Sequence, residues 1–145
     1  MKRFCIVLAS IALVLCAWSP AFALPPLPHH VSGTIAVNGS AVQDGTTIAA
    51  WTGATQLATT TTLISPPGSG IAYYAITVPG DDSETAGVIE GATPGAVIRF
   101  YIGAPYMTWA DQQVTWQSGG ITTLHLTATP GATMPRLYCP VISRP

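Results

Sequence analysis

The sequence predicts an all-β fold: a two-sheet β-sandwich of about seven strands, preceded by a signal-peptide helix. Three observations lead to this prediction. From residue 31 onward, short segments of alternating apolar and polar residues are separated by turn residues such as Asn38-Gly39. No segment beyond residue 23 repeats its apolar residues with the 3.6-residue period of a helix. Charged residues make up only 8% of the chain, so its polar surface must consist largely of threonine, serine, glutamine and glycine.

The first 23 residues have the pattern of a secretory signal peptide. Residues 1–3 are a basic start, the apolar run Phe4–Trp18 follows, and an Ala-x-Ala cleavage signal ends at Ala23. The run of about 15 residues is shorter than the roughly 20 needed for a helix to cross a bilayer. We therefore expect cleavage after Ala23, a secreted or cell-surface protein, and no membrane span after cleavage. An uncleaved anchor and a lipoprotein signal at Cys16 are the alternatives.

The expected mature chain, residues 24–145, is long enough for one domain with a real core and too short for two. We expect a proline-rich lead-in at residues 24–30, the sandwich domain at residues 31–128, and a linker and C-terminal tail at residues 129–145. The mature chain contains three arginines, no lysine and six acidic residues, which gives a formal charge of −3. Because it has no basic patch, we expect no nucleic-acid partner.

The first three expected strands are each bounded by turn residues. Val31–Val37 alternates and stops at an Asn-Gly turn pair. An Asp-Gly pair introduces Thr46–Trp51, in which Ile48 and Ala50 share one face. A Thr-Gly pair then introduces Thr55–Ile64, which is rich in β-branched threonine and ends at a loop of proline and glycine.

The remaining four strands follow the same alternation. Ile71–Val78 and Val97–Ile102 place large apolar residues at every second position. Gln112–Trp116 pairs Val114 with its terminal tryptophan, and a Ser-Gly-Gly turn introduces Ile121–Ala128. The core expected from these faces is Ile35, Val37, Ile48, Ala50, Leu63, Tyr74, Ile76, Val78, Ile98, Phe100, Ile102, Val114, Leu124 and Leu126.

Several turn and core motifs resemble one known group of modules. They are Ser32-Gly-Thr-Ile-Ala-Val-Asn-Gly39, Val42-x-x-Gly45-Thr-x-Ile48-x-Ala50, Tyr74-x-Ile-x-Val78-Pro-Gly-Asp-Asp82, Gly95-x-x-Ile98-x-Phe-Tyr-Ile-Gly103 and Trp116-x-Ser-Gly-Gly120. Together they are similar to the carboxypeptidase regulatory-like, transthyretin-like group of Ig-like sandwiches in secreted prokaryotic proteins. The resemblance covers roughly residues 31–128. It implies an Ig-like sandwich with a non-catalytic, structural or adhesive role.

Aromatic residues are candidates for an interface. Trp51, Tyr73 and Tyr101 fall on strand faces opposite the expected core, and Tyr106 and Trp109 are expected in a loop. Flat rings on a sheet can stack on sugars, which makes a carbohydrate-binding module the runner-up function. The alternatives are cross-strand packing and cover from the tail.

Residues 79–95 form a long acidic connection with a candidate short strand at Ala86–Ile89. Carboxylates in one loop are weak candidates for a calcium site. However, they lack the Asp-x-Asp-x-Asp-Gly spacing of a calcium loop, so a solvated loop is the simpler interpretation and we expect no metal or other cofactor. These carboxylates belong to Asp81, Asp82, Glu84 and Glu90.

Cys139 is the cysteine that remains after the expected cleavage, and it lies in the tail. An odd cysteine in an exported chain indicates a crosslink to a partner or a free thiol. A buried tail cysteine that acts as a small apolar residue is the alternative.

No catalytic pattern is visible in the sequence. There is no Gly-x-Ser-x-Gly, no His-Glu-x-x-His and no pair of acids on neighbouring expected strands. The three histidines, His29, His30 and His125, have no Glu or Cys at ligand spacing. We therefore expect a protein that is not an enzyme, with a structural or adhesive role. Its partner would be a protein or a surface polymer, or a second copy bound through sheet edges or Cys139. An accessory or inhibitor subunit is the third hypothesis.

Overall fold

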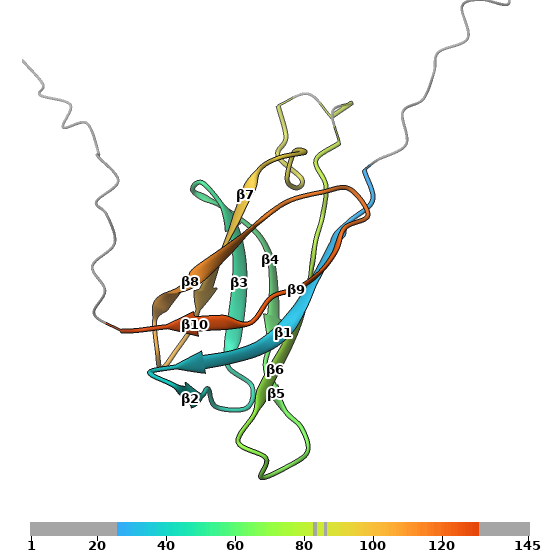
Figure 1. Cartoon of the computed structure of the whole chain (residues 1–145). Helices are drawn as coiled ribbons and strands as arrows, with labels where there is room; N and C mark the ends of the chain where they lie inside the picture. Colours follow the sequence, from blue (N-terminus) through green and yellow to red (C-terminus); the bar gives the residue numbers. More distant parts are fainter. Residues whose placement is uncertain (1–25, 83, 86, 131–145) are drawn as a thin grey trace, which may run out of the picture.

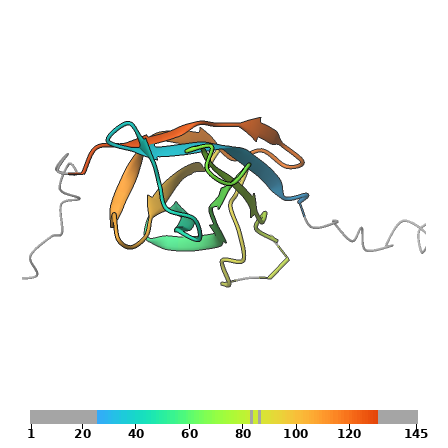
Figure 2. The same cartoon turned by 90° about the horizontal axis from the view of Figure 1, so that it is seen from below.

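Two β-sheets pack face to face in the computed structural model, which describes residues 26–82, 84–85 and 87–130 (Figures 1 and 2). Within these residues the chain forms ten strands and no helix. The prediction of an all-β, two-sheet fold is confirmed. The expected signal-peptide helix and its cleavage site lie outside the described residues. The strands are β1 (His29–Val37), β2 (Ser40–Ala41), β3 (Thr47–Thr52), β4 (Thr55–Thr61), β5 (Leu63–Ile64), β6 (Ala72–Val78), β7 (Val97–Ile102), β8 (Thr108–Thr115), β9 (Ile121–Thr123) and β10 (Leu126–Ala128).

The first sheet is built around β1 and has the order β10-β1-β6-β5, with β2 and β9 also paired to β1. Strand β1 is antiparallel to β6 and β2 but parallel to β9 and β10. The second sheet has the order β4-β3-β7-β8 and is antiparallel throughout. Figure 2 shows the two layers, with β1 and β10 above and β3 below. The first and the last strands of the domain are therefore neighbours.

The core lies between the sheets and follows the predicted alternation. Strand β6 alternates between buried and exposed along its whole length, and β7 has the predicted bounds. Two expected core residues, Val114 and Leu124, are only partly buried, although both pack against the core. Trp116, which the sequence placed beside the core, is fully buried, and its indole N–H donates to the carbonyl of Val78 at 3.1 Å. The expected core residues that are buried are Ile35, Val37, Ile48, Ala50, Tyr74, Ile76, Val78, Ile98, Phe100, Ile102 and Leu126.

The expected strand Thr55–Ile64 is wrong as a single strand, because the chain changes sheets at Thr62. The Thr62 side chain is buried, accepts the N–H of Thr46 at 3.0 Å and donates to the carbonyl of Gln43 at 2.7 Å. These bonds pull the backbone out of the second sheet, and the next two residues pair with β6 in the first sheet. Leu63 consequently points away from the core and is 61% exposed, which contradicts its predicted burial.

Other strand bounds also differ from the sequence expectation. Strand β1 begins at His29, two residues before the expected start, and β8 begins at Thr108 rather than at Gln112. The expected strand Ile121–Ala128 is interrupted and forms β9 and β10. Of the candidate strand at 86–89, residues 87–89 are in turn and loop conformation and residue 86 lies outside the described residues.

The interruption between β9 and β10 is caused by a close approach of two backbones. A Cβ atom at Gly33 would collide with the carbonyl oxygen of Leu124. Because Gly33, in the middle of β1, has no side chain, the Leu124 carbonyl can turn inward over this strand. Any larger residue at position 33 would block this carbonyl. Strands β9 and β10 keep the same parallel register with β1 on either side of this point, from His30 opposite Ile121 to Val37 opposite Ala128.

Side chains replace the ladder bonds that this interruption removes. The phenol of Tyr74, the register partner of Gly33 on β6, donates to the inward Leu124 carbonyl at 2.7 Å. Burial raises the pKa of Tyr74, so its hydroxyl remains a donor. On the other side of the gap, the N–H and the hydroxyl of Thr34 bond to Nδ1 of His125 at 3.2 and 2.8 Å. The backbone polar groups near the crossing thus find partners although the ladder is broken.

The two sheets are also joined along the side where β8 meets β10. The amide of Gln112 accepts the N–H of Thr127 at 2.7 Å and donates to the Thr127 hydroxyl at 2.8 Å. That hydroxyl in turn donates to Asp111 at 3.1 Å. The Gln112 side chain thus takes the place of a backbone partner. Its amide group satisfies the N–H and the hydroxyl of Thr127, although β8 and β10 are not paired through their backbones. These bonds therefore link β8 in the second sheet to β10 in the first.

We predict that Tyr74→Phe destabilises the protein by about 1–3 kcal/mol, because it leaves the inward Leu124 carbonyl buried without a donor. Chemical denaturation with urea measures this difference in the free energy of unfolding. The matched control is Tyr73→Phe on the adjacent, 41% exposed tyrosine, which should change stability by less than about 0.5 kcal/mol. Equal effects of the two substitutions would contradict this role for Tyr74.

Candidate functional site

Four side chains gather on the outer face of the second sheet. Arg99 and Tyr101 alternate with buried residues of β7, so both point away from the core. Strand β3 places Trp51 opposite Arg99, and β8 places Trp109 opposite Tyr101. Three neighbouring strands thus contribute to one surface, which we call the Trp109 cluster: Trp51, Arg99, Tyr101 and Trp109.

Trp109 lies at the centre of this cluster. Its ring centroid is 5.2 Å from that of Tyr101 and 6.2 Å from that of Trp51, with interplanar angles of 66° and 68°. These are edge-to-face contacts, the preferred geometry of packed aromatic pairs. The guanidinium of Arg99 lies 4.8 Å from the Trp109 ring centroid, a cation–π distance. The rings therefore form an assembled surface without a partner being present.

Two details show how closely the cluster covers the sheet. Ala49 points to the outer face of β3, between core-facing neighbours, yet it is only 5% exposed. Large side chains above the sheet must cover it, and its register partner Tyr101 belongs to the cluster. The indole nitrogen Nε1 of Trp51 is buried and has no hydrogen-bond partner among the described residues. A buried donor without a hydrogen-bond partner lowers the stability of the fold by about 1–3 kcal/mol, and such atoms are rare in folded proteins.

The structure brings two of the three predicted aromatic interface residues together. Trp51 and Tyr101 both belong to the cluster, whereas Tyr73 lies on β6 in the first sheet. The sequence missed Trp109 and Arg99: Trp109 was expected in a loop, and Arg99 was not considered. Tyr106, also expected in that loop, lies in the turn before β8, where its hydroxyl accepts the N–H of Gln43 at 3.0 Å.

The acidic loop uses its carboxylates to hold its own backbone. Asp81 accepts the N–H of Glu90 and Asp82 accepts the N–H of Glu84, both at 3.0 Å. The hydroxyl of Thr85 donates to Glu90 at 3.1 Å. Among the described residues no group of three or more His, Cys, Asp or Glu side chains is arranged to hold a metal ion. This geometry gives the weak calcium candidates a local structural role.

Two further expectations concern the membrane and the tail. Cys139, the candidate for a crosslink, lies outside the described residues. Between residues 26 and 130, leaving out 83 and 86, the structure contains no helix with the length and apolar composition of a membrane span.

His29 is a buried titratable group in the described domain. Its side chain is 2% exposed; Nδ1 accepts the N–H of Gln117 at 3.2 Å, so Nε2 carries the proton and donates to Thr122 at 2.8 Å. Gly120 packs so closely that a Cβ there would lie 2.9 Å from Nε2. Burial, and secondarily the neighbouring His30, lower the pKa of His29. Both ring nitrogens are used in structural bonds, which leaves neither for chemistry.

Comparison with known proteins identifies no similar protein. No protein-family model matches the sequence, and neither the curated proteins nor the solved structures compared with it gave a match. The functional argument therefore rests on the residues of this chain.

We predict that the protein loses stability as the pH falls through about 6.5, the ordinary pKa of histidine. The pKa of His29 is lowered in the folded state, so between the two pKa values the unfolded chain binds more protons. The free energy of unfolding should therefore be highest above this range and decrease on acidification. Urea denaturation at a series of pH values between 8 and 5 measures this pH dependence of the free energy of unfolding.

His29→Gln should flatten that pH dependence, whereas the control His30→Gln, on the exposed neighbour, should retain most of it. An unchanged slope in His29→Gln would show that another group carries the effect.

Proposed function

We propose that this protein is a non-catalytic, exported β-sandwich module of the Ig-like, transthyretin-like kind, with a structural or adhesive role at the cell surface or in the medium. The observation that carries the proposal is the Trp109 cluster. Tryptophan, tyrosine and arginine are the residue types most enriched at the energetic centres of protein interfaces. Here all three types share one outward face of one sheet. The sequence resemblance and the signal-peptide pattern support the fold type and the export.

The energetics of the cluster favour binding over a purely structural role. The rings are already packed against one another, so a partner that covers them would immobilise few side chains on binding. Arg99 is the only lysine or arginine between residues 26 and 130, and it lies within this surface. The partner that fits is a mainly apolar surface with carbonyl or carboxylate oxygens.

Carbohydrate binding is supported less well by this geometry. Sugar rings stack on flat, accessible aromatic faces, but the Trp109 ring is steeply tilted to the rings of both Trp51 and Tyr101. Arg99 also occupies one face of Trp109. Tyr73, the third aromatic residue expected in such a platform, lies in the other sheet. The cluster therefore resembles a compact protein-binding surface more than a sugar platform.

We predict that Trp109→Ala weakens binding of the exported protein to the isolated surface fraction of its producing cells by at least about tenfold. Sedimentation of labelled protein with that fraction measures the affinity. Tyr73→Ala, which removes an exposed aromatic ring from the other sheet, is the matched control and should bind like the unaltered protein. Arg99→Gln, which keeps all three rings, should weaken binding to a smaller extent.

The outcomes of this experiment distinguish a protein-binding role from carbohydrate binding. Binding that protease treatment of the surface fraction abolishes supports a protein partner. Binding that survives protease and is displaced by soluble oligosaccharides would favour the carbohydrate-binding module instead. Equal losses in Trp109→Ala and Tyr73→Ala, or no binding by the unaltered protein, would contradict the proposal.

A further inference from the structure

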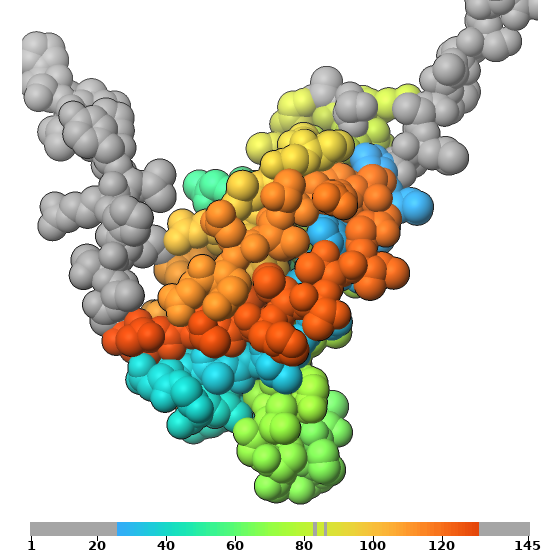
Figure 3. All heavy atoms as spheres, viewed as in Figure 1, coloured from blue at the N-terminus to red at the C-terminus, as the bar shows by residue number. Residues whose placement is uncertain are grey.

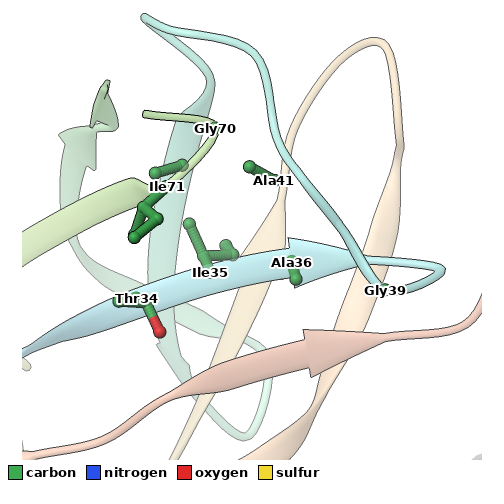
Figure 4. Close-up of a pocket in the computed structure, with 8 residues that line it drawn as sticks. Thr34, Ile35, Ala36, Gly39, Ala41, Gly70 and Ile71 are labelled. Atoms are coloured by element: carbon green, nitrogen blue, oxygen red, sulfur yellow. The ribbon is translucent and has the colours of Figure 1, made fainter. Parts of the chain in front are cut away.

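A hollow opens at the edge of the first sheet, whereas the Trp109 cluster lies on the second sheet. Strand β1 pairs with β6 as far as Ile35 and with β2 from Ala36 onward. The change of partner leaves an open space of about 200 Å³ between β2 and the start of β6, with Ala41 and Ile71 on its two sides (Figure 4). A cavity of about 150 Å³ is sufficient to hold a benzene ring, so this hollow can receive one large apolar side chain.

An exposed apolar corner adjoins this hollow. Ile71, at its rim, is 42% exposed, and Tyr73 two residues later on the same face is 41% exposed. Tyr73 pairs across the sheet with Leu63, which is 61% exposed. Elsewhere the outward positions of β1 and β6 carry mainly small or polar residues such as Ser32 and Thr77. The corner of Leu63, Ile71 and Tyr73 is therefore an apolar patch on a polar face.

The described chain ends beside the same hollow. The carbonyl of Ala128, the last residue of β10, accepts the N–H of Asn38 at 2.9 Å. The next residue, Gly39, lines the hollow. Figure 3 shows the end of the described chain, in red, directly beside the β1–β2 turn in cyan, with the β5–β6 loop in green as the neighbouring lobe.

We propose that the apolar corner and the hollow are the docking site for this chain's own C-terminal segment, residues 137–142. This segment reads Leu-Tyr-Cys-Pro-Val-Ile and is uncharged. It begins seven residues after Pro130, and an extended chain covers about 3.3 Å per residue, so it can reach across the corner. A short tether gives an effective concentration of about millimolar, which favours this segment over a second copy in dilute solution. The inference concerns the other sheet and does not depend on the proposed function.

Cys139 provides a natural reporter for this docking. In the full chain carrying Cys5→Ser and Cys16→Ser, Ile71→Cys places a second thiol at the rim of the hollow, and Leu63→Cys places one at the far side of the corner. Thr59→Cys, exposed on the outer face of the second sheet, is the matched control. Mild oxidation followed by non-reducing gels and peptide mass spectrometry measures the rate and the partner of each disulfide.

We expect Ile71→Cys or Leu63→Cys to form an intramolecular disulfide with Cys139 at least about tenfold faster than Thr59→Cys does. Val141→Asp should remove this advantage without changing the Thr59→Cys rate, because it makes docking of the segment costly. Similar rates at all three positions would overturn the proposal. Disulfide-linked dimers as the main product, with a rate that rises with protein concentration, would also overturn it, since the occupant would then be a second copy.

Discussion

The close approach of the Leu124 carbonyl to Gly33 is the constraint on which the remaining architecture depends. It turns one peptide group between β9 and β10 inward over the first strand, where the Tyr74 phenol binds it. Strands β9 and β10 are thereby fixed beside β1 on either side of the interruption. Through the Gln112 amide, β10 is then linked to β8, which is also paired with β7. Strand β8 carries Trp109, so a glycine in the first sheet helps to place the aromatic surface on the second.

This organisation also explains how a domain with few charges builds distinct surfaces. The outward positions of the first sheet are mainly threonine, serine and histidine, many of which bond to one another, as His30 does to Thr77 at 2.9 Å. Two groups of large apolar side chains lie on the outer faces of the sheets: the half-buried Trp109 cluster on the second sheet, and the exposed corner of Leu63, Ile71 and Tyr73 on the first. The former contains a cation, whereas the latter is uncharged and lies next to the end of the described chain. These differences are the reason why we propose a partner with oxygen acceptors for the first and an apolar segment for the second.

The sequence predicted those parts of the fold that local alternation determines. Strands β6 and β7 were found because every second residue is large and apolar. The change of sheet at Thr62 was missed because threonine has the same β-propensity whether it continues a strand or bonds inward to Gln43. Burial of Leu63 was wrong for the same reason. Trp109 was missed because its strand, Thr-Trp-Ala-Asp-Gln-Gln-Val-Thr, contains too few apolar residues to show a period, and only its register with Tyr101 reveals its neighbours.

Amide hydrogen exchange in Gly33→Ala tests the central role of the crossing most directly. Alanine has a higher strand propensity than glycine, so without the crossing the substitution would be neutral or mildly stabilising. We predict that the amides of β10, including Thr127, lose protection by at least about tenfold, while those of the β3–β7 pair keep theirs. Unchanged protection of β10 in a folded Gly33→Ala protein would show that the inward Leu124 carbonyl is not what holds the last strand in place.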